Sequence, residues 1–225
     1  MTTQVVGVDG APDGWVAVAI GGDGGRIVEA VSNRTFAQLA DEFVDAVVIA
    51  VDMPIGLPTA DAWPRRADMA ARASLAPKQS SVFVVPPIEA LQAATHAEAV
   101  AFCKAASIGG VSQQAYALRK KIAEVAAVSA TDSRLHEVHP EISFRSMKGE
   151  PLKRGKRTWA GFQERLALLR AIGLEPPSEL PNVAGATVDD VLDATAAAWT
   201  AGRIARGEAR FLPADAAEGE PRIWF

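Results

Sequence analysis

The run from Ala46 to Asp52, Ala-Val-Val-Ile-Ala-Val-Asp, constrains the fold more than any other part of the sequence, because it is apolar at every position except its last. A strand with apolar side chains on both faces belongs in the middle of a sheet that helices cover on both sides. Pro54, Gly56 and Pro58 follow the run and end it. The segment therefore predicts an α/β protein with a buried central strand.

Three strands are expected before this segment and one after it. The first three are predicted over residues 4–9, 15–20 and 26–31, with the glycine-rich stretch 21–25 as the hairpin turn between the second and the third. Strands joined by hairpins pair antiparallel, whereas strands reached through helices run parallel. With a further strand over Leu135–Phe144, the order predicts a mixed five-stranded sheet whose first three strands are antiparallel and whose later strands are parallel.

Helical patterns fill most of the remaining chain, and Thr35 and Ser112 suit the N-caps of two of these helices. The expected helices cover residues 35–43, 61–75, 88–106, 112–129, 159–172 and 188–206, and a short edge strand is expected at 223–225. The helical segment from about residue 61 to residue 130 is an insert in this order. We expect it to shape a substrate cleft.

The composition narrows the class of protein. A chain of 225 residues can bury one sizeable core, and the absence of a long polar linker favours a single domain over residues 1–225. No window approaches the roughly 18 apolar residues of a membrane span, and no basic leader precedes an apolar run, so we expect a cytoplasmic protein with no membrane contact. With a net charge of −4, any contact with nucleic acid must come from a local basic patch.

Acidic residues stand where the predicted sheet would bind a ligand. Asp9 and Asp52 each end an apolar strand, and ligands of open α/β sheets bind outside the carboxyl ends of the strands. Asp190 and Asp193 are three residues apart in the last helix and share a face, and Asp193 falls among apolar residues. A buried carboxylate without a partner is costly, so this arrangement favours chemistry over packing.

A further group of polar residues follows the predicted fifth strand. Period-two alternation would place Glu137, His139 and Glu141 on one face of that strand or just beyond it. Carboxylate oxygens suit Mg²⁺ or Mn²⁺, whereas three histidines and one cysteine make zinc the weaker candidate. Clustered carboxylates that hold two such ions about 3.5–4 Å apart suit in-line displacement at phosphorus, which suggests phosphodiester cleavage.

Several motifs together resemble a known family. They are Gly7–Gly10 with Gly14–Val16, Val51–Pro58, Ser80–Phe83, Glu137–Phe144, Lys156–Gly161 and Asp189–Ala194. In this order the chain resembles the domain of unknown function 429 family, which is described as predicted ribonuclease-H-like nucleases.

The resemblance implies a ribonuclease-H-like fold and a set of metal ligands. Asp9 would bridge the metals and Asp52 would flank them, while Asp190 and Asp193 would be the helical ligands. Glu141 would be an additional ligand or the base that orients water.

The leading hypothesis is a nuclease that uses Mg²⁺ or Mn²⁺ and takes nucleic acid as its substrate. The residues expected to hold phosphates are Arg65, Arg66, Arg72, Lys153 and Lys156. One alternative takes Gly7–Gly10 as the phosphate loop of an actin-like or sugar-kinase-like ATPase, although such enzymes need a second related domain. Another is a module on the same fold that binds nucleic acid or protein without cutting.

Overall fold

Five strands form one mixed sheet in the computed structural model, which describes residues 4–21, 26–177 and 179–225. The strands are β1 (Gln4–Ala11), β2 (Gly14–Gly21), β3 (Ile27–Asn33), β4 (Ala46–Val51) and β5 (Leu135–Glu137), in the spatial order β3-β2-β1-β4-β5. β1 pairs antiparallel with β2 and β2 with β3, whereas β4 runs parallel to both β1 and β5. The predicted mixed sheet is confirmed and is consistent with a ribonuclease-H-like fold. The predicted hairpin turn falls on residues 22–25, outside the described residues.

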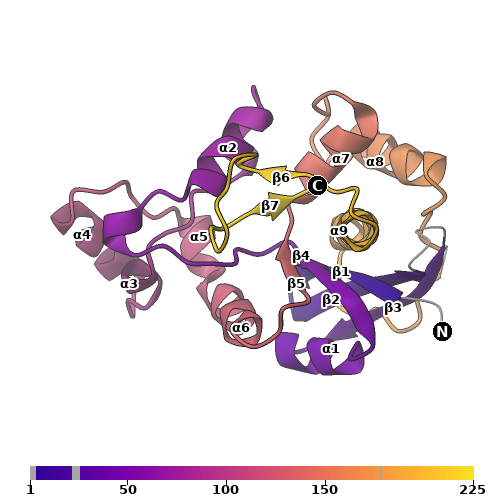
Figure 1. Cartoon of the computed structure of the whole chain (residues 1–225), viewed down its shortest axis with the longest axis horizontal. Coiled ribbons are helices and arrows are strands. Elements are labelled where there is room, and N and C mark those ends of the chain that lie inside the picture. Colours follow the sequence, from indigo (N-terminus) through magenta and orange to yellow (C-terminus); the bar gives the residue numbers. More distant parts are fainter. Residues whose placement is uncertain (1–3, 22–25, 178) are drawn as a thin grey trace.

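Alternation along β1 divides the core into two layers. Val6 and Val8 face α1 (Phe36–Glu42) and α6 (Arg119–Ser129), where they belong to one hydrophobic cluster. Val5 faces the opposite side, which α9 (Val188–Ala205) covers. Figure 1 shows α9 in cross-section on one side of the sheet and α1 on the other. β4, expected from Ala46–Asp52 as a buried central strand, lies between β1 and β5 and has helices on both of its faces, although Val47 is 46% exposed.

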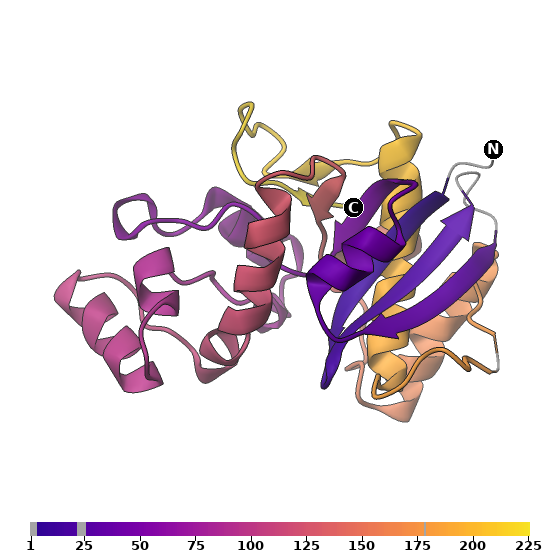
Figure 2. The same cartoon turned by 90° about the horizontal axis from the view of Figure 1, so that it is seen from below.

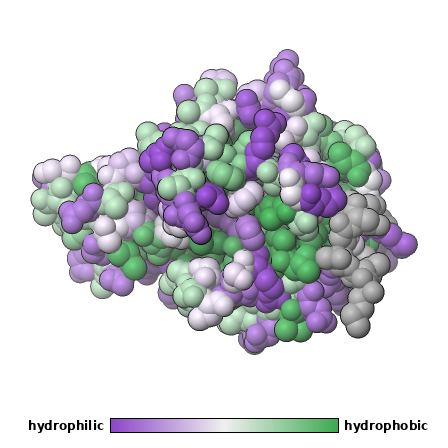
Figure 3. All heavy atoms as spheres, viewed as in Figure 1, coloured by the Kyte–Doolittle hydropathy of each residue, from purple (hydrophilic) through white to green (hydrophobic). Residues whose placement is uncertain are grey.

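α9 approaches the sheet closely because both surfaces carry small residues at the contact. Its sheet-facing positions are Ala194, Ala197, Ala198 and Ala201. Opposite them in β1 is Gly7, where a Cβ atom would lie 1.9 Å from the backbone nitrogen of Ala198. In the space-filling view, hydrophobic residues gather where α9 lies beside the sheet (Figure 3).

The segment between β4 and β5 contains short helices. They are η1 (Ala60–Ala62), α2 (Arg66–Ser74), η2 (Gln79–Ser81), α3 (Ile88–Leu91), α4 (His96–Ala105), α5 (Gln113–Ala117) and α6. The predicted helices 88–106 and 112–129 are each broken in two. A capping box formed by Thr95 and Glu98 starts α4 anew, while Ser112 caps α5 as predicted. α3 and α4 lie to one side, away from the sheet, in both orientations (Figures 1 and 2).

The strand predicted over Leu135–Phe144 is wrong beyond its third residue. β5 ends at Glu137, and α7 (Pro140–Lys148) begins after the N-cap residue His139. The reason is Pro140, because proline has no backbone N–H to donate and its fixed φ suits the first position of a helix. Glu141 consequently lies in the first turn of a helix and not on a strand.

The helix predicted over 61–75 is shorter than expected, because α2 begins only at Arg66, after Pro64, while most of the other predicted elements are found closely. Thr35 caps α1, and α8 (Trp159–Ala171) and α9 match the two predicted late helices to within a residue or so at each end. The predicted edge strand is found as β7 (Ile223–Trp224), which pairs antiparallel with β6 (Phe211–Leu212) in a separate two-stranded sheet. A bridge from Trp224 to Val138 joins this hairpin to the chain just after β5.

The contact at Gly7 makes a testable prediction about the fold. Substitution Gly7→Ala should destabilise the protein by about 3 kcal/mol or more, lowering Tm by roughly 6–12 °C, because the added methyl group meets helix backbone that cannot rotate away. The control is Gly110→Ala, whose Cβ would meet no atom within 4 Å and should change Tm little. Thermal unfolding followed by circular dichroism measures both, and equal Tm values for the two variants would contradict the prediction.

Candidate metal centre

Three carboxylates meet at one end of the sheet. Asp9 lies in β1, Asp52 directly follows β4, and Asp193 lies in the second turn of α9. Each offers one oxygen atom to the group, and the three oxygens lie within 4.8 Å of one another. A cluster of this size can hold a divalent cation.

The periodicities of the three elements explain why these side chains converge. β1 and β4 are parallel neighbours, so their carboxyl ends lie together, and Asp52 N donates to Val8 O at 2.9 Å. Asp9 is two residues beyond Gly7 and therefore faces α9 as Gly7 does. In α9, Asp193 precedes the sheet-facing Ala197 by four residues, which places it on the same face of the helix.

Asp193 carries the strongest sign of a missing partner. The residue is 2% exposed, and its Oδ2 atom accepts a hydrogen bond from the Lys156 ammonium group. Its Oδ1 atom is buried and has no hydrogen-bond partner among the described residues. Asp9 is also buried, and its Oδ1 accepts the backbone N–H of Gly10 at 2.7 Å. An uncompensated buried oxygen is costly, so the donor set fits a cation that binds carboxylates.

The raised pKa values of the three carboxyl groups also indicate that positive charge is missing from this site. Burial raises the pKa of Asp9 well above its usual range, and the nearby carboxylates of Asp52 and Asp193 raise it further. Burial also raises the pKa of Asp52. For Asp193, burial raises the pKa to about 6 even though the Lys156 ammonium group lowers it. The Lys156 ammonium group therefore does not offset the burial of Asp9 and Asp193 together with the charge of the partly buried Asp52.

The three carboxylates open into a cleft of about 790 Å³. Its lining comes from the ends of the strands, from α5 and the following loop, from α7, and from the loop before α8. Polar groups in the lining include Lys78, His139, Lys156 and Arg157. The cleft is thus acidic at its base and carries basic side chains on its walls.

Asp190, the other helical acid implied as a ligand, is not one of the three clustered carboxylates. It is the third residue of α9, and its Oδ2 accepts the backbone N–H of Thr187 at 2.8 Å in a capping box. Its side chain also lines the cleft. The structure therefore gives Asp190 a capping function beside the site.

Glu141 lines the same cleft from the first turn of α7. Its Oε1 accepts a hydrogen bond from Arg165 of α8, whose side chain is fully buried. Arg165 was not among the residues singled out in the sequence, because it follows Gln163 and Glu164 in α8 and such a polar run is typical of an exposed helix face. The ion pair fixes the position of Glu141 at the cleft wall.

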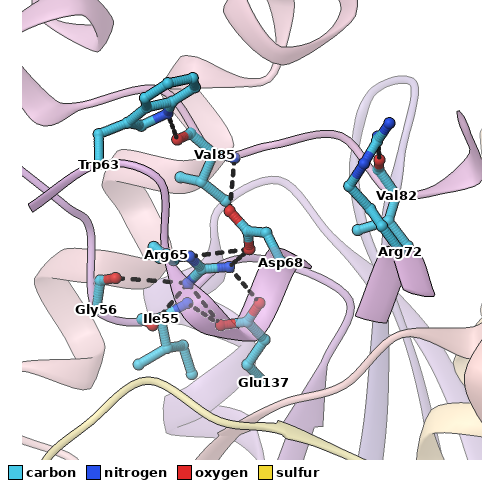
Figure 4. Close-up of polar contacts among 9 residues, drawn as sticks. All are labelled: Ile55, Gly56, Trp63, Arg65, Asp68, Arg72, Val82, Val85 and Glu137. Carbon is cyan, nitrogen blue, oxygen red and sulfur yellow. Dashed lines mark hydrogen bonds and ion pairs between the residues drawn. The ribbon is translucent and has the colours of Figure 1, made fainter. Parts of the chain in front are cut away.

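Arg65, expected to hold phosphate, is not available to a substrate. Its guanidinium is buried and donates to Asp68 and to both oxygens of Glu137, at 2.8 and 2.9 Å (Figure 4). It also donates to the carbonyl oxygen of Ile55 at 3.0 Å, and Ile55 N donates to Glu137 at 2.8 Å. Arg65 therefore ties α2 and β5 to the loop that follows Asp52, which is a structural function.

The other basic residues expected to hold phosphate have different environments. Arg66 is paired at the surface with Asp215 and Glu220, and Arg72 donates to the carbonyl oxygen of Val82. Lys153 is exposed in the loop between α7 and α8. Of the five, Lys156 is the one that lines the cleft, where it binds Asp193 directly.

Sequence reasoning missed the loop around Ser81 as a wall of the cleft, and it assigned His139 no function there. His139 lines the cleft, its Nε2 atom lies 3.2 Å from the carbonyl oxygen of Ser81, and its Nδ1 atom is buried without a partner among the described residues. Pro140 was the feature of the sequence that could have revealed this, because a proline directly after His139 indicates that a helix starts there, next to the end of β5.

Comparison with known proteins gives one match. The family described as "Protein of unknown function (DUF429)" matches residues 7–218, which span nearly the whole chain. No curated protein and no solved structure shows a significant match. None of the helices in the described part of the chain is long and apolar enough to cross a bilayer.

The crowded carboxylates predict that removing one charge stabilises the metal-free protein. In EDTA at about pH 8, Asp9→Asn should raise the free energy of unfolding by about 1 kcal/mol or more, or Tm by roughly 2–4 °C. The pKa of Asp9 is raised in the folded state, so its ionised form opposes folding. The gain should shrink as the pH falls, because the wild-type carboxyl group then takes up a proton and loses its repulsion.

Thermal unfolding of both proteins between about pH 5 and pH 8 makes this measurement. Asp41→Asn, an exposed carboxylate on α1, is the control and should leave Tm nearly unchanged at every pH. A wild-type protein that is more stable than Asp9→Asn at pH 8 without metal would show that the cluster is not strained by its own charge.

Proposed function

The chain belongs to the DUF429 family, and we propose that it is a divalent-metal-dependent nuclease that hydrolyses phosphodiester bonds in the cleft above Asp9, Asp52 and Asp193. The observation that carries the proposal is the buried carboxylate group with its unpartnered Asp193 oxygen. Acidic side chains grouped in this way, with one oxygen atom left without a partner, can bind a cation.

The three carboxylates would hold Mg²⁺ or Mn²⁺. Their donor atoms are all hard oxygens, which these ions prefer over nitrogen or sulfur. Asp9 lies near the carboxyl end of β1, which has β4 beside it in the sheet and α9 packed on its face, and this position supports its proposed place as the shared ligand. When bound, the cation would supply Lewis-acid activation of the attacking water and of the phosphate.

The residues around the carboxylates have separate functions in this proposal. Lys156 neutralises Asp193 when no cation is present, and with a cation in the site its ammonium group is free to donate to a phosphate oxygen of the substrate. Lys78 and Arg157, which line the walls, would bind neighbouring phosphates. Glu141, held in place by Arg165, would orient the attacking water and accept its proton.

The helical insert completes the cleft in this proposal. Gln114 of α5 and Leu118, which follows it, line the cleft opposite the loop before α8. We therefore regard residues 1–225 as one domain in which the insert 61–130 forms a wall of the substrate site. Arg65, with its two carboxylate partners, would keep the loop after Asp52 in place beneath that wall.

Binding of the cation can be tested without any substrate. Saturating Mn²⁺ should raise the Tm of the wild-type protein, since a ligand at about 100 times its Kd adds about 2.7 kcal/mol, or roughly 5–10 °C for a chain of this size. The shift should shrink below about pH 6, because burial raises the pKa of Asp193 to about 6 and the cation must displace its proton. Differential scanning calorimetry with and without EDTA measures the effect.

Asp9→Asn and Asp193→Asn should each lose most of the Mn²⁺-dependent shift, whereas Asp41→Asn should keep it. An equal shift in all four proteins would place the cation elsewhere on the chain.

Cleavage is tested with labelled single-stranded, duplex, DNA–RNA hybrid and branched substrates in Mg²⁺ or Mn²⁺. The wild-type protein should cut at least one of them, and EDTA should stop the reaction. Asp9→Asn and Asp193→Asn should lower the rate by more than about 100-fold, because even groups that only support a metal ligand contribute 10–100-fold. Asp41→Asn is the matched control, and cleavage at the wild-type rate by both site variants would refute the assignment.

A further inference from the structure

A second cavity lies beside the cleft and exposes an aromatic ring. It has a volume of about 380 Å³, and its lining includes Trp159, Phe162 and Val188. Trp159 is 76% exposed and Val188 is 62% exposed. Tryptophan has a large apolar surface, and a ring left this open beside a second exposed apolar side chain is typical of a binding surface.

The two cavities are continuous along one basic segment. Lys156 and Arg157 line both of them, and the exposed Lys153 and Arg154 precede these residues in the same loop. An acid, Asp189, also lines the second cavity, but its carboxylate accepts a hydrogen bond from the Thr187 hydroxyl at 3.1 Å within the helix cap. The surface therefore combines an open aromatic ring with positive charge on the side that leads to the carboxylates.

We propose that Trp159 is a stacking platform for an unpaired nucleobase, and that the protein takes single-stranded or locally unpaired nucleic acid. The inference rests on the proposed function, which it deepens by naming the form of the substrate. Surfaces that bind single strands combine a positively charged track for the backbone with aromatic rings on which bases stack. Here the track is the segment 153–157 and the ring is Trp159.

The geometry around Trp159 suits this use. Phe162 packs beside it with the ring centroids 5.6 Å apart and the planes inclined by 36°, which braces an indole that is still 76% exposed. Bases inside a duplex are stacked on each other and cannot reach such a ring, so only an unpaired base can use it. A second copy of this chain is a poorer occupant, because a symmetric interface would bring the two basic segments together.

The test measures binding and cleavage separately. Fluorescence anisotropy with a labelled oligonucleotide of about 12 nucleotides, single-stranded or duplex, is measured in the Asp9→Asn background, in which cleavage is suppressed. Adding Trp159→Ala should raise the Kd for the single strand by about 5- to 150-fold, the equivalent of ~1–3 kcal/mol per stacked base, and should leave duplex binding unchanged. Trp159→Phe should restore most of the affinity, because it keeps a ring to stack on.

Val44→Ala, at a similarly exposed apolar residue outside both cavities, is the matched control and should leave the affinity for both oligonucleotides unchanged. Unchanged single-strand affinity in Trp159→Ala would overturn the inference, as would an equal loss for single strand and duplex. A shift from dimer to monomer in analytical ultracentrifugation, with affinity intact, would overturn it in favour of self-association.

Failure of this inference is distinguishable from failure of the proposed function. Metal-dependent cleavage of single strands that is equally fast in the wild type and in Trp159→Ala would refute the platform and leave the nuclease standing. Single-strand binding that depends on Trp159, without metal-dependent cleavage of any substrate, would uphold the platform and refute the nuclease.

Discussion

The close contact between α9 and β1 is the constraint on which the rest of the structure depends. The helix can lie this near the sheet only because Gly7 has no side chain and Ala194, Ala197 and Ala198 face it. The same contact fixes the position of α9 along β1. It therefore places Asp193 next to the carboxyl end of β1. The packing of small residues between α9 and β1 therefore also brings the three carboxylates together. The alanines of α9 contribute both to the hydrophobic core and to the geometry of the site.

In the described part of the chain, two groups of acidic side chains differ in how fully they are neutralised. Asp68 and Glu137 share the guanidinium of Arg65, and backbone N–H groups complete their hydrogen bonds, as buried ion pairs require. Near the carboxyl end of β1, Lys156 pairs with Asp193, while within the described residues Asp9 and Asp52 have no ion-pair partner and Asp193 Oδ1 has no hydrogen-bond partner. The contrast within one chain is an argument for function, because the first group shows how this fold balances buried charge when the purpose is structural.

Much of this arrangement could be predicted from local patterns, and the exceptions have physical causes. The strand that contains Asp9, the strand that precedes Asp52 and the helix that bears Asp193 were predictable because their periodicities are clear. The end of β5 at Glu137 was not predictable in this way, because Glu137, His139 and Glu141 alternate as in a strand although Pro140 begins a helix. The burial of Arg65 depends on contacts with residues far away in sequence, which no local pattern records.

The overall acidity of the chain is compatible with a polyanionic substrate because its charges are segregated. A net charge of −4 opposes the binding of nucleic acid at long range, but salt screens that field within about 10 Å. The charged groups at the contact surface therefore determine whether nucleic acid binds. There the loop before α8 presents a run of basic residues, and Lys156 joins that run to Asp193. A cation at the carboxylates would change the local charge from negative towards neutral and release Lys156 for a phosphate. Binding of the cation should therefore increase the affinity for a nucleic-acid strand. Lys156, which lines both cavities, would couple these two binding events.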